Sequence, residues 1–223
     1  MPVTIAFDVY GTLIDTSGIK AALQKVVGDK AEAFSQTWRS KQLEYAFRRG
    51  LMQRYEDFAV CTRNALDYSC LFHQQSLSVL QKQVLLDSYG QLPAFNDVDA
   101  GLSRLKADGH QLFAFSNGKK QAVEVLLMNA GIRTFFADII STDSIKSFKP
   151  NPEVYRYFLQ TSGASEHSTW LVSSNSFDVI GALSAGMNAA WLKRNETDIF
   201  DPWDFEPTIM MSSLSELADK NLS

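Results

Sequence analysis

The stretch IAFDVYGTL, residues 5–13, decides how the rest of the chain is interpreted. A short apolar run ends in one carboxylate, Asp8, and a Gly-Thr turn follows at once. This layout predicts that Asp8 stands at the carboxyl end of a buried strand, where open α/β sheets bind their ligands. Two residues later the chain has Tyr10 and no second aspartate. A nucleophile without an acidic partner suggests chemistry on a leaving group that needs no proton.

Composition excludes several classes of protein. The 223 residues suit one large domain, or one domain that carries an inserted smaller one. The net charge of -4, without a basic stripe, argues against a nucleic-acid partner. No stretch has the length of a membrane span and the first residues lack a signal-peptide pattern, so no membrane partner is expected. Cys61 and Cys70 show no metal spacing, which favours a reduced, cytoplasmic protein.

The apolar pattern predicts a doubly wound, mostly parallel α/β sheet. Short runs that are typical of strands buried on both faces occur at residues 3–7, 111–116, 138–141, 169–173 and 189–192, with a sixth, edge strand at 208–211. Helical patterns separate the later runs. One covers 117–129 and stops at Gly131, the next begins at Asn151-Pro152, and a third covers 176–185 and stops at Gly186.

Residues 15–93 interrupt this alternation, because they contain no convincing strand. Four helices are expected there, at 18–27, 30–49, 55–68 and 75–88. A helical insert of this length is too long for a simple crossover between strands. We therefore expect a Rossmann-like core domain of residues 1–14 and 94–223, with a helical cap domain of residues 15–93 above the strand ends.

Each strand of the alternating part ends in polar residues. Asp8 follows the first strand, Ser116-Asn117-Gly118 the second, Ser147-Phe148-Lys149-Pro150 the third, and Ser173-Ser174-Asn175-Ser176-Phe177-Asp178 the fourth. Taken singly, these could be a turn, a surface lysine or an acidic residue in the first turn of a helix. Taken together and in this order, they predict one crevice lined by chemically active groups.

The four motifs D-x-Y-G-T, S-N-G, F-K-P and S-S-N-x-F-D, in this order, resemble those of the haloacid dehalogenase superfamily. The segment W-R-x-K-Q-L-E-Y at residues 38–45, followed by residues 51–58, resembles one branch of it, the L-2-haloacid dehalogenases. The resemblance covers about residues 4–192. It implies a Rossmann-like core with an inserted cap.

Two positions depart from the phosphatase branch of the superfamily. Tyr10 replaces the aspartate that protonates a leaving alkoxide, and a halide leaves as a stable anion without such help. Ser174 replaces an acidic Mg²⁺ ligand, so that Asp8 and Asp178 alone offer a poor site for a hard cation. Both changes point to an enzyme without a metal or other cofactor.

The resemblance implies a two-step displacement. The Asp8 carboxylate attacks C2 of a short L-2-haloacid, halide leaves, and C2 inverts. Water then attacks the carboxyl carbon of the resulting ester and releases a D-2-hydroxy acid. Lys149 is expected to keep Asp8 ionised. Asp178 is expected to position or deprotonate the water, with Ser173 and Asn175 holding that water in place.

The resemblance also implies roles in orienting the nucleophile and in binding the substrate and the halide. Thr12 is expected to orient the nucleophile, and Ser116 to bind the substrate carboxylate with backbone N–H groups. Arg39 would ordinarily extend to solvent from a cap helix. The resemblance instead implies that it binds the departing halide in a cradle completed by Asn117 and Phe177, where a fixed cation lowers the barrier.

The remaining candidates have two interpretations each. Tyr155 matches a tyrosine near the family's site, and it equally fits a buried helix residue. The substrate slot is expected to be lined by Tyr10, Gln42, Leu43 and Phe58, although cap-to-core packing explains the apolar ones as well.

The sequence leaves two other functions open. The main alternative is a Mg²⁺-dependent phosphatase of the same superfamily, and the second is a binding module that keeps the fold without catalysis. A Ser-His-Asp hydrolase is disfavoured, because His73, His110 and His167 lie away from the strand ends. By analogy, an apolar patch on the cap could form a homodimer, with Tyr45, Phe47, Leu51 and Met52 as its members.

Overall fold

The computed structural model describes residues 2–222, and within them six parallel strands form one sheet. The strand order is β3-β2-β1-β4-β5-β6, so that β6 forms an edge as expected. The bounds are Thr4–Phe7 (β1), Gln111–Ser116 (β2), Asp138–Ser141 (β3), Thr169–Ser173 (β4), Asn188–Leu192 (β5) and Ile209–Met211 (β6). The predicted doubly wound parallel sheet is confirmed.

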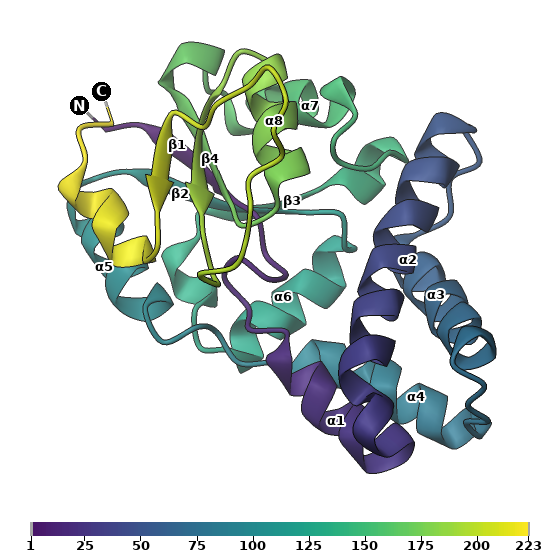
Figure 1. Ribbon diagram of the computed structural model, residues 1–223. Helices are drawn as coiled ribbons and strands as arrows, with labels where there is room; N and C mark the ends of the chain where they lie inside the picture. Colours follow the sequence, from purple (N-terminus) through teal and green to yellow (C-terminus); the bar gives the residue numbers. More distant parts are fainter. Residues whose placement is uncertain (1, 223) are drawn as a thin grey trace.

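Helices cover both faces of this sheet (Figure 1). On one face, α5 (Val98–Ala107) and α6 (Lys120–Asn129) share an apolar cluster with Ile5 and Phe7 of β1. On the other, α7 (Pro152–Ser162) and α8 (Ser176–Ser184) share one with Ala6. Successive residues of a strand point to opposite faces, so β1 is apolar throughout and is buried on both sides.

The residues that were predicted to begin and end helices lie at helix ends in the structure. Asn151 accepts a hydrogen bond from the Glu153 N–H at 3.0 Å and caps α7, with Pro152 in the first helical position. Gly131 and Gly186 follow α6 and α8 with φ of +75° and +83°, a backbone conformation that favours glycine. These turns return the chain to β3 and β5.

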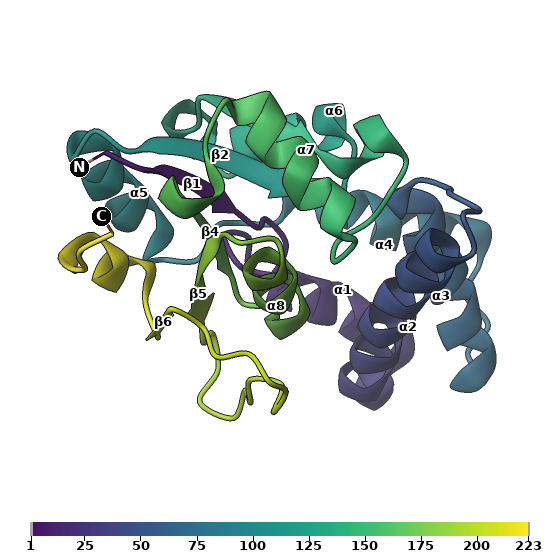
Figure 2. The ribbon, with the colours of Figure 1, turned by 90° about the horizontal axis from the view of Figure 1, so that it is seen from above.

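The cap consists of α1 (Ser17–Val27), α2 (Ala31–Leu51), α3 (Phe58–Phe72) and α4 (Val79–Ser88). It lies beyond the carboxyl ends of the strands (Figure 2). The buried residues of α2 recur every three or four positions and form its packed stripe: Ala31, Phe34, Trp38, Gln42 and Ala46. Within residues 2–222, no helix is both long and apolar enough to cross a membrane.

The two segments that join cap and core run side by side. The Asp15 N–H donates to the Pro93 carbonyl at 2.8 Å, and the Phe95 N–H donates to the Leu13 carbonyl at 3.0 Å. We propose on this basis that the core consists of residues 1–14 and 94–223 and the cap of residues 15–93. The outermost limits of that division, residues 1 and 223, lie outside the described residues.

Three helices begin three or four residues later than expected. The loop after β2 continues to Lys119, because the Gly118 N–H bonds back to Ser116 Oγ at 3.1 Å. Helix α3 begins at Phe58 because the Asp57 side chain accepts from the Val60 N–H at 2.9 Å. The capping box of Ser78 starts α4 four residues after the expected position 75. Side-chain caps thus decide the boundaries of α3 and α4, where apolar spacing is ambiguous.

Candidate active site

Asp8 follows β1 directly, where its N–H bonds to the Val172 carbonyl of β4 at 3.0 Å. Its carboxylate is nearly buried and receives four side-chain donors. Three of them reach Oδ2: Thr12 Oγ1 at 2.9 Å, Ser173 Oγ at 3.2 Å and Asn175 Nδ2 at 2.8 Å. Among the side chains of residues 2–222, Lys149 Nζ alone reaches Oδ1, at 3.3 Å. The carboxylate is therefore fixed through one oxygen, and the other oxygen is the less encumbered one.

Lys149 is buried and connects two carboxylates. Besides Asp8, its Nζ donates to Asp178 Oδ2 at 2.8 Å and to the Phe115 carbonyl at 2.8 Å, and it lies 4.2 Å from the centre of the Phe115 ring. Only 2% of the side chain is exposed. A buried ammonium with two carboxylate partners compensates part of their charge and holds them at fixed positions.

Asp178 lies behind Lys149 and has no exposed surface. Its Oδ1 accepts from the Tyr155 hydroxyl at 2.7 Å. Burial raises the pKa of Asp178, and the nearby Lys149 lowers it. Burial also raises the pKa of Tyr155 well above its ordinary value, so that Tyr155 remains a neutral donor. Asp178 thus contacts Lys149 and Tyr155, and, like Asp8 itself, it is not among the residues that line the cavity, so its action on water stays a prediction.

Replacing Tyr155 by phenylalanine is expected to lower the free energy of unfolding by about 1–3 kcal/mol, because Asp178 Oδ1 then loses a donor inside the protein. Denaturant unfolding followed by circular dichroism measures this. Tyr157→Phe is the matched control, since Tyr157 lies on the same helix and donates no hydrogen bond within residues 2–222. The Gly181→Ala variant also tests the hydrogen bond between Tyr155 and Asp178. Its added Cβ would come within 2.7 Å of Tyr155 Cζ and displace the ring, so we expect a lower free energy of unfolding. Equal stabilities of the Tyr155→Phe and Tyr157→Phe variants would contradict this role.

Ser116 and Asn117 hold loops together in this structure. Asn117 Oδ1 accepts from the Lys149 N–H at 2.9 Å and from Thr142 Oγ1 at 3.1 Å, which ties the loop that carries Lys149 to the end of β2. Ser116 Oγ accepts from the Gly118 N–H. Both side chains are buried and neither lines the cavity. The structure therefore places Ser116 and Asn117 beside the loop of Lys149, and their expected contacts with substrate and halide stay predictions.

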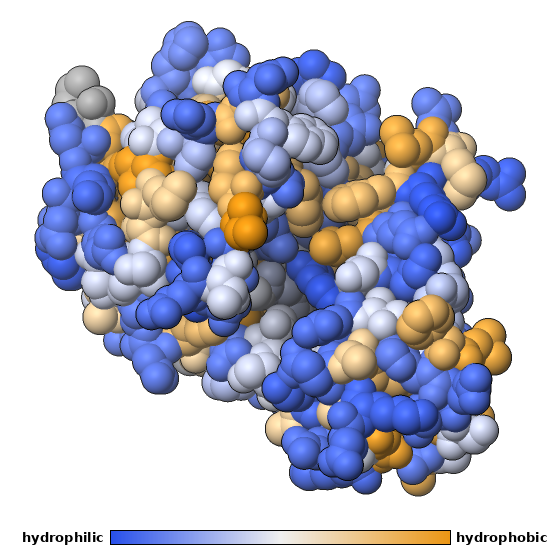
Figure 3. All heavy atoms as spheres, viewed as in Figure 1, coloured by the Kyte–Doolittle hydropathy of each residue, from blue (hydrophilic) through white to orange (hydrophobic). Residues whose placement is uncertain are grey.

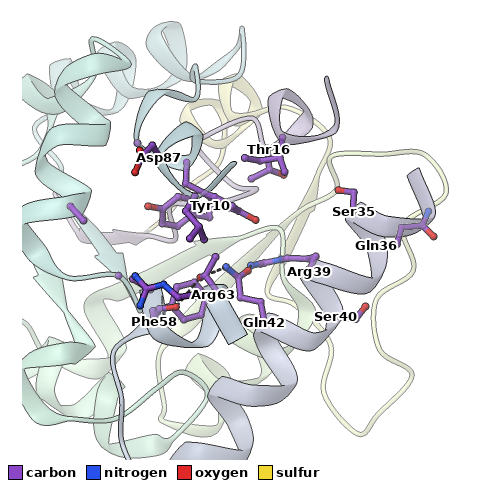
Figure 4. Close-up of a pocket in the computed structure, with 18 of the residues that line it drawn as sticks. Tyr10, Thr16, Ser35, Gln36, Arg39, Ser40, Gln42, Phe58, Arg63 and Asp87 are labelled. Carbon is purple, nitrogen blue, oxygen red and sulfur yellow. Dashed lines mark hydrogen bonds between the residues drawn. The ribbon is translucent and has the colours of Figure 1, made fainter. Parts of the chain in front are cut away.

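A cavity of about 800 Å³ lies between cap and core. The space-filling view shows the surface hollowed between the two parts, with hydrophilic residues in the hollow (Figure 3). Of the expected slot residues, Tyr10, Gln42 and Phe58 line the cavity, as does Arg39 (Figure 4).

The expected binding residues Leu43 and Phe177 do not line this cavity either. Leu43 is half-buried, and it follows Gln42 by one position, which turns it about 100° around the helix axis and away from the cavity. Phe177 packs edge to face on Phe47 of α2, with 5.1 Å between ring centres. It therefore contributes to the contact between cap and core.

Arg39 extends from the cap helix α2 to the core. Its Nη1 donates to Gln42 Oε1 at 2.8 Å, and its Nη2 donates to Asn175 Oδ1 at 3.3 Å. Asn175 in turn donates to Asp8, so that one amide links the cap cation to the core carboxylate. Gln42 is itself held by Thr62 Oγ1, 2.6 Å from its Nε2. Burial lowers the pKa of Arg39, and Tyr89 and Asp8 oppose that shift.

The sequence interpretation missed Tyr89. This residue follows α4 at the return to the core, and its ring meets those of Tyr10 and Trp38 edge to face, at 6.1 and 5.4 Å between centres. It lines the cavity, and burial raises its pKa to about 12. Its position at the end of the insert was the only available signal, because that end must lie close to the strand ends.

Ser174 stands where an acidic Mg²⁺ ligand is found in the phosphatases, and its hydrogen bonds give it a structural role. Its Oγ donates to the Gly11 carbonyl at 2.9 Å, and its N–H donates to Thr12 Oγ1 at 2.9 Å. These bonds fix the turn after Asp8 against the end of β4. Within residues 2–222, no three His, Cys, Asp or Glu side chains are grouped so that they could hold a metal ion.

Comparison with known proteins agrees with this geometry. Residues 3–186 match the family of haloacid dehalogenase-like hydrolases. An (S)-2-haloacid dehalogenase of Pseudomonas putida is 34% identical over 96% of this chain and 94% of its own length. Haloacetate dehalogenase H-2 of Moraxella sp. (strain B) is 36% identical over 85% of each chain.

Solved structures agree as well. L-2-haloacid dehalogenase of Xanthobacter autotrophicus, with chloropropionic acid covalently bound, superimposes with a TM-score of 0.91 at 27% identity over 98% of both chains. A further L-2-haloacid dehalogenase gives a TM-score of 0.94 at 28% identity, over 98% of this chain and 97% of that one. This chain therefore belongs to the haloacid dehalogenase-like hydrolases, within the branch of the (S)-2-haloacid dehalogenases.

Proposed function

We propose that this protein hydrolyses short L-2-haloacids to D-2-hydroxy acids through an ester on Asp8, without a metal ion. The observation that carries the proposal is the setting of Asp8. Three donors hold its Oδ2, and a buried ammonium alone faces its Oδ1. The related enzymes named above act on 2-haloacids, and one of them has been solved with chloropropionic acid covalently bound.

In the first step, Asp8 Oδ1 attacks C2 of the substrate from the side opposite the halogen. The C2–halogen bond breaks, and its electron pair leaves with the halide. C2 is thereby inverted, and the negative charge of Asp8 moves to the leaving group. Lys149 then faces an ester in place of a carboxylate, while its contact with Asp178 keeps the ammonium in place.

In the second step, water attacks the carboxyl carbon of Asp8. The ester C–O bond breaks, the hydroxy acid takes one proton of the water, and the second proton goes to solvent. Negative charge develops on Oδ2 before that bond breaks. Thr12, Ser173 and Asn175 already direct donors at this atom, and donors fixed in advance stabilise such charge most effectively.

Arg39 supplies the positive charge that the departing halide needs. It lines the cavity and is linked to the nucleophile through Asn175, and its 3.3 Å bond to Asn175 is its longer one. In the proposed reaction this bond is exchanged for a contact with the halide. Asn175 keeps its bond to Asp8 during the exchange, so that the nucleophile stays in position.

Two groups support metal independence and disfavour a Mg²⁺-dependent phosphatase. Tyr10 lines the cavity where phosphatases have a carboxylate, and burial raises its pKa to about 12, so it stays neutral. Ser174 Oγ is engaged with the Gly11 carbonyl. Both positions therefore lack the negative oxygen ligands that Mg²⁺ prefers. Hydrolysis of p-nitrophenyl phosphate only in the presence of Mg²⁺ would revive the phosphatase.

Chloride release from each enantiomer of 2-chloropropionate, with EDTA present, tests the proposal. We expect release from the L enantiomer alone, at a rate that EDTA does not change, with D-lactate as the organic product. Chiral chromatography of the product checks the inversion. Release from the D enantiomer, or complete loss of activity with EDTA, would contradict the proposed mechanism.

We also propose that the protein is cytoplasmic and forms a homodimer. Its proposed reaction requires the haloacid substrate and water and no other partner. Cys61 and Cys70 are free and buried, as suits a reducing compartment. The proposed contact patch is smaller than expected, because Leu51 and Met52 are 87% and 61% exposed while Tyr45 and Phe47 are partly buried. Analytical ultracentrifugation of wild-type protein and of the Leu51→Glu variant tests the dimer. We expect the variant to sediment as a monomer.

A further inference from the structure

The cavity is much larger than a short 2-haloacid requires. A molecule such as 2-chloropropionate occupies roughly 150 Å³, about five water volumes at about 30 Å³ each. The cavity offers about 800 Å³, which lies in the range of pockets for far larger ligands. A short 2-haloacid therefore leaves most of this space unfilled, and the space can hold an extended acyl chain.

The charged groups that face this space are nearly all paired. Lys119 forms an ion pair with Asp57 at 2.7 Å, and Arg39 is bonded to Gln42 and Asn175. The two carboxylates of the lining, Asp87 and Asp198, accept from Gln83 and Asn195. Arg63 differs from these, because its guanidinium has no hydrogen bond or ion pair within residues 2–222.

Arg63 lies on α3, beyond Thr62, whose hydroxyl holds Gln42. In the close-up its side chain lies beside Phe58 and Gln42, while Asp87 lies on the side of Tyr10 (Figure 4). The wall around it includes the apolar side chain of Ala59. An acyl chain held at the Arg39 end would pass the apolar side chains of Phe58 and Ala59, and its far end would meet a cation without a partner.

We propose that Arg63 forms a second anion-binding subsite, which recognises the distal carboxylate of L-2-halodicarboxylic acids. The inference rests on the proposed function, because it needs the reacting end of the substrate to lie at Asp8. The distal carboxylate replaces solvent on the Arg63 guanidinium and forms charge-assisted hydrogen bonds there. Because this contact is present before and during the reaction, it lowers KM and leaves kcat nearly unchanged.

Steady-state chloride release from two series of acids tests the subsite. The first is L-2-chlorosuccinate, L-2-chloroglutarate and L-2-chloroadipate, and the second is their distal methyl esters, with L-2-chloropropionate as reference. For at least one dicarboxylate, we expect Arg63→Gln to raise KM by about tenfold with kcat within about twofold. The esters and the reference should change by less than about twofold. Arg156→Gln is the matched control, since Arg156 is also exposed, and it does not line the cavity.

The outcomes separate the subsite from the reaction itself. A loss of affinity for a dicarboxylate in Arg63→Gln but not in Arg156→Gln, weaker at high ionic strength, supports the subsite. Chloride release from L-2-chloropropionate with no effect of Arg63→Gln on any dicarboxylate would overturn the subsite and leave the proposed function intact. Failure to release chloride from every acid would overturn both.

Discussion

Replacing Asp8 by asparagine is expected to reduce kcat for chloride release by a factor on the order of 10⁴ or more. The substitution keeps the size of the side chain and removes the negative oxygen that attacks carbon. The surrounding side chains of Thr12, Ser173, Asn175 and Lys149 are hydrogen-bond donors to Asp8, and none of them brings a second carboxylate to this position. Chloride release under saturating substrate measures the effect.

A control is needed because Asp8 is also a partner of Lys149. The pair of Lys149 with Asp178 remains in the variant, so the thermal midpoint should change far less than the activity. Asp201→Asn is a matched control, since Asp201 also accepts from a serine hydroxyl, of Ser176, away from Asp8. Turnover within tenfold of wild type in the Asp8 variant would contradict a role as nucleophile.

Replacing Lys149 by methionine is expected to reduce kcat by about 10²–10³-fold and to lower the free energy of unfolding by about 3–5 kcal/mol. Methionine keeps much of the volume and leaves two carboxylates, Asp8 and Asp178, without their shared cation. Arginine is expected to fail as well, because its planar group does not fit between these carboxylates as an ammonium does. Denaturant unfolding and chloride release at the same temperature measure the two losses.

The stability of the Lys149→Met variant should also depend on pH. Burial raises the pKa of Asp178, and without Lys149 the opposing effect is gone. A carboxyl whose pKa is higher in the folded state binds its proton more tightly there. The contribution of Asp178 to the stability of the variant is therefore fully present below the ordinary carboxyl pKa of about 3.9 and is lost as pH rises through the raised value, so the loss of stability relative to wild type should grow with pH.

A second substitution separates the two effects of Lys149. Asp178→Asn in the Lys149→Met background removes the unpaired buried charge, so part of the lost stability should return while activity stays low. If the double variant were no more stable than Lys149→Met at neutral pH, the unpaired Asp178 carboxylate would not be the cause of the lost stability.

The sheet could be predicted from the sequence because its strands are buried on both faces. An apolar run such as residues 111–116 that is followed by a helical pattern predicts a strand, and the repeated strand–helix alternation predicts that the strands are parallel. The cluster around Asp8 was also predictable, since Lys149, Ser173 and Asn175 each follow a strand or its loop at the same edge.

The contacts between cap and core were not predictable in the same way. Whether Arg39 meets Asn117 or Asn175 depends on how α2 is seated above the strand ends, and no local pattern reports that position. The direction in which the Asp178 side chain points depends on its hydrogen bond with Tyr155, which is fully buried beside Gly181 of α8. Leu43 shows the same limit, because one step along a helix separates the cavity side from another side.

A single turnover in H₂¹⁸O tests the ester on Asp8 most directly. Enzyme in excess over L-2-chloropropionate is quenched, and the peptide that contains Asp8 is analysed by mass spectrometry together with the lactate. We predict that ¹⁸O enters the carboxylate of Asp8 and that the lactate formed in this first turnover is unlabelled. Label found in the lactate, with none in Asp8, would show direct attack of water on C2 and would contradict the mechanism.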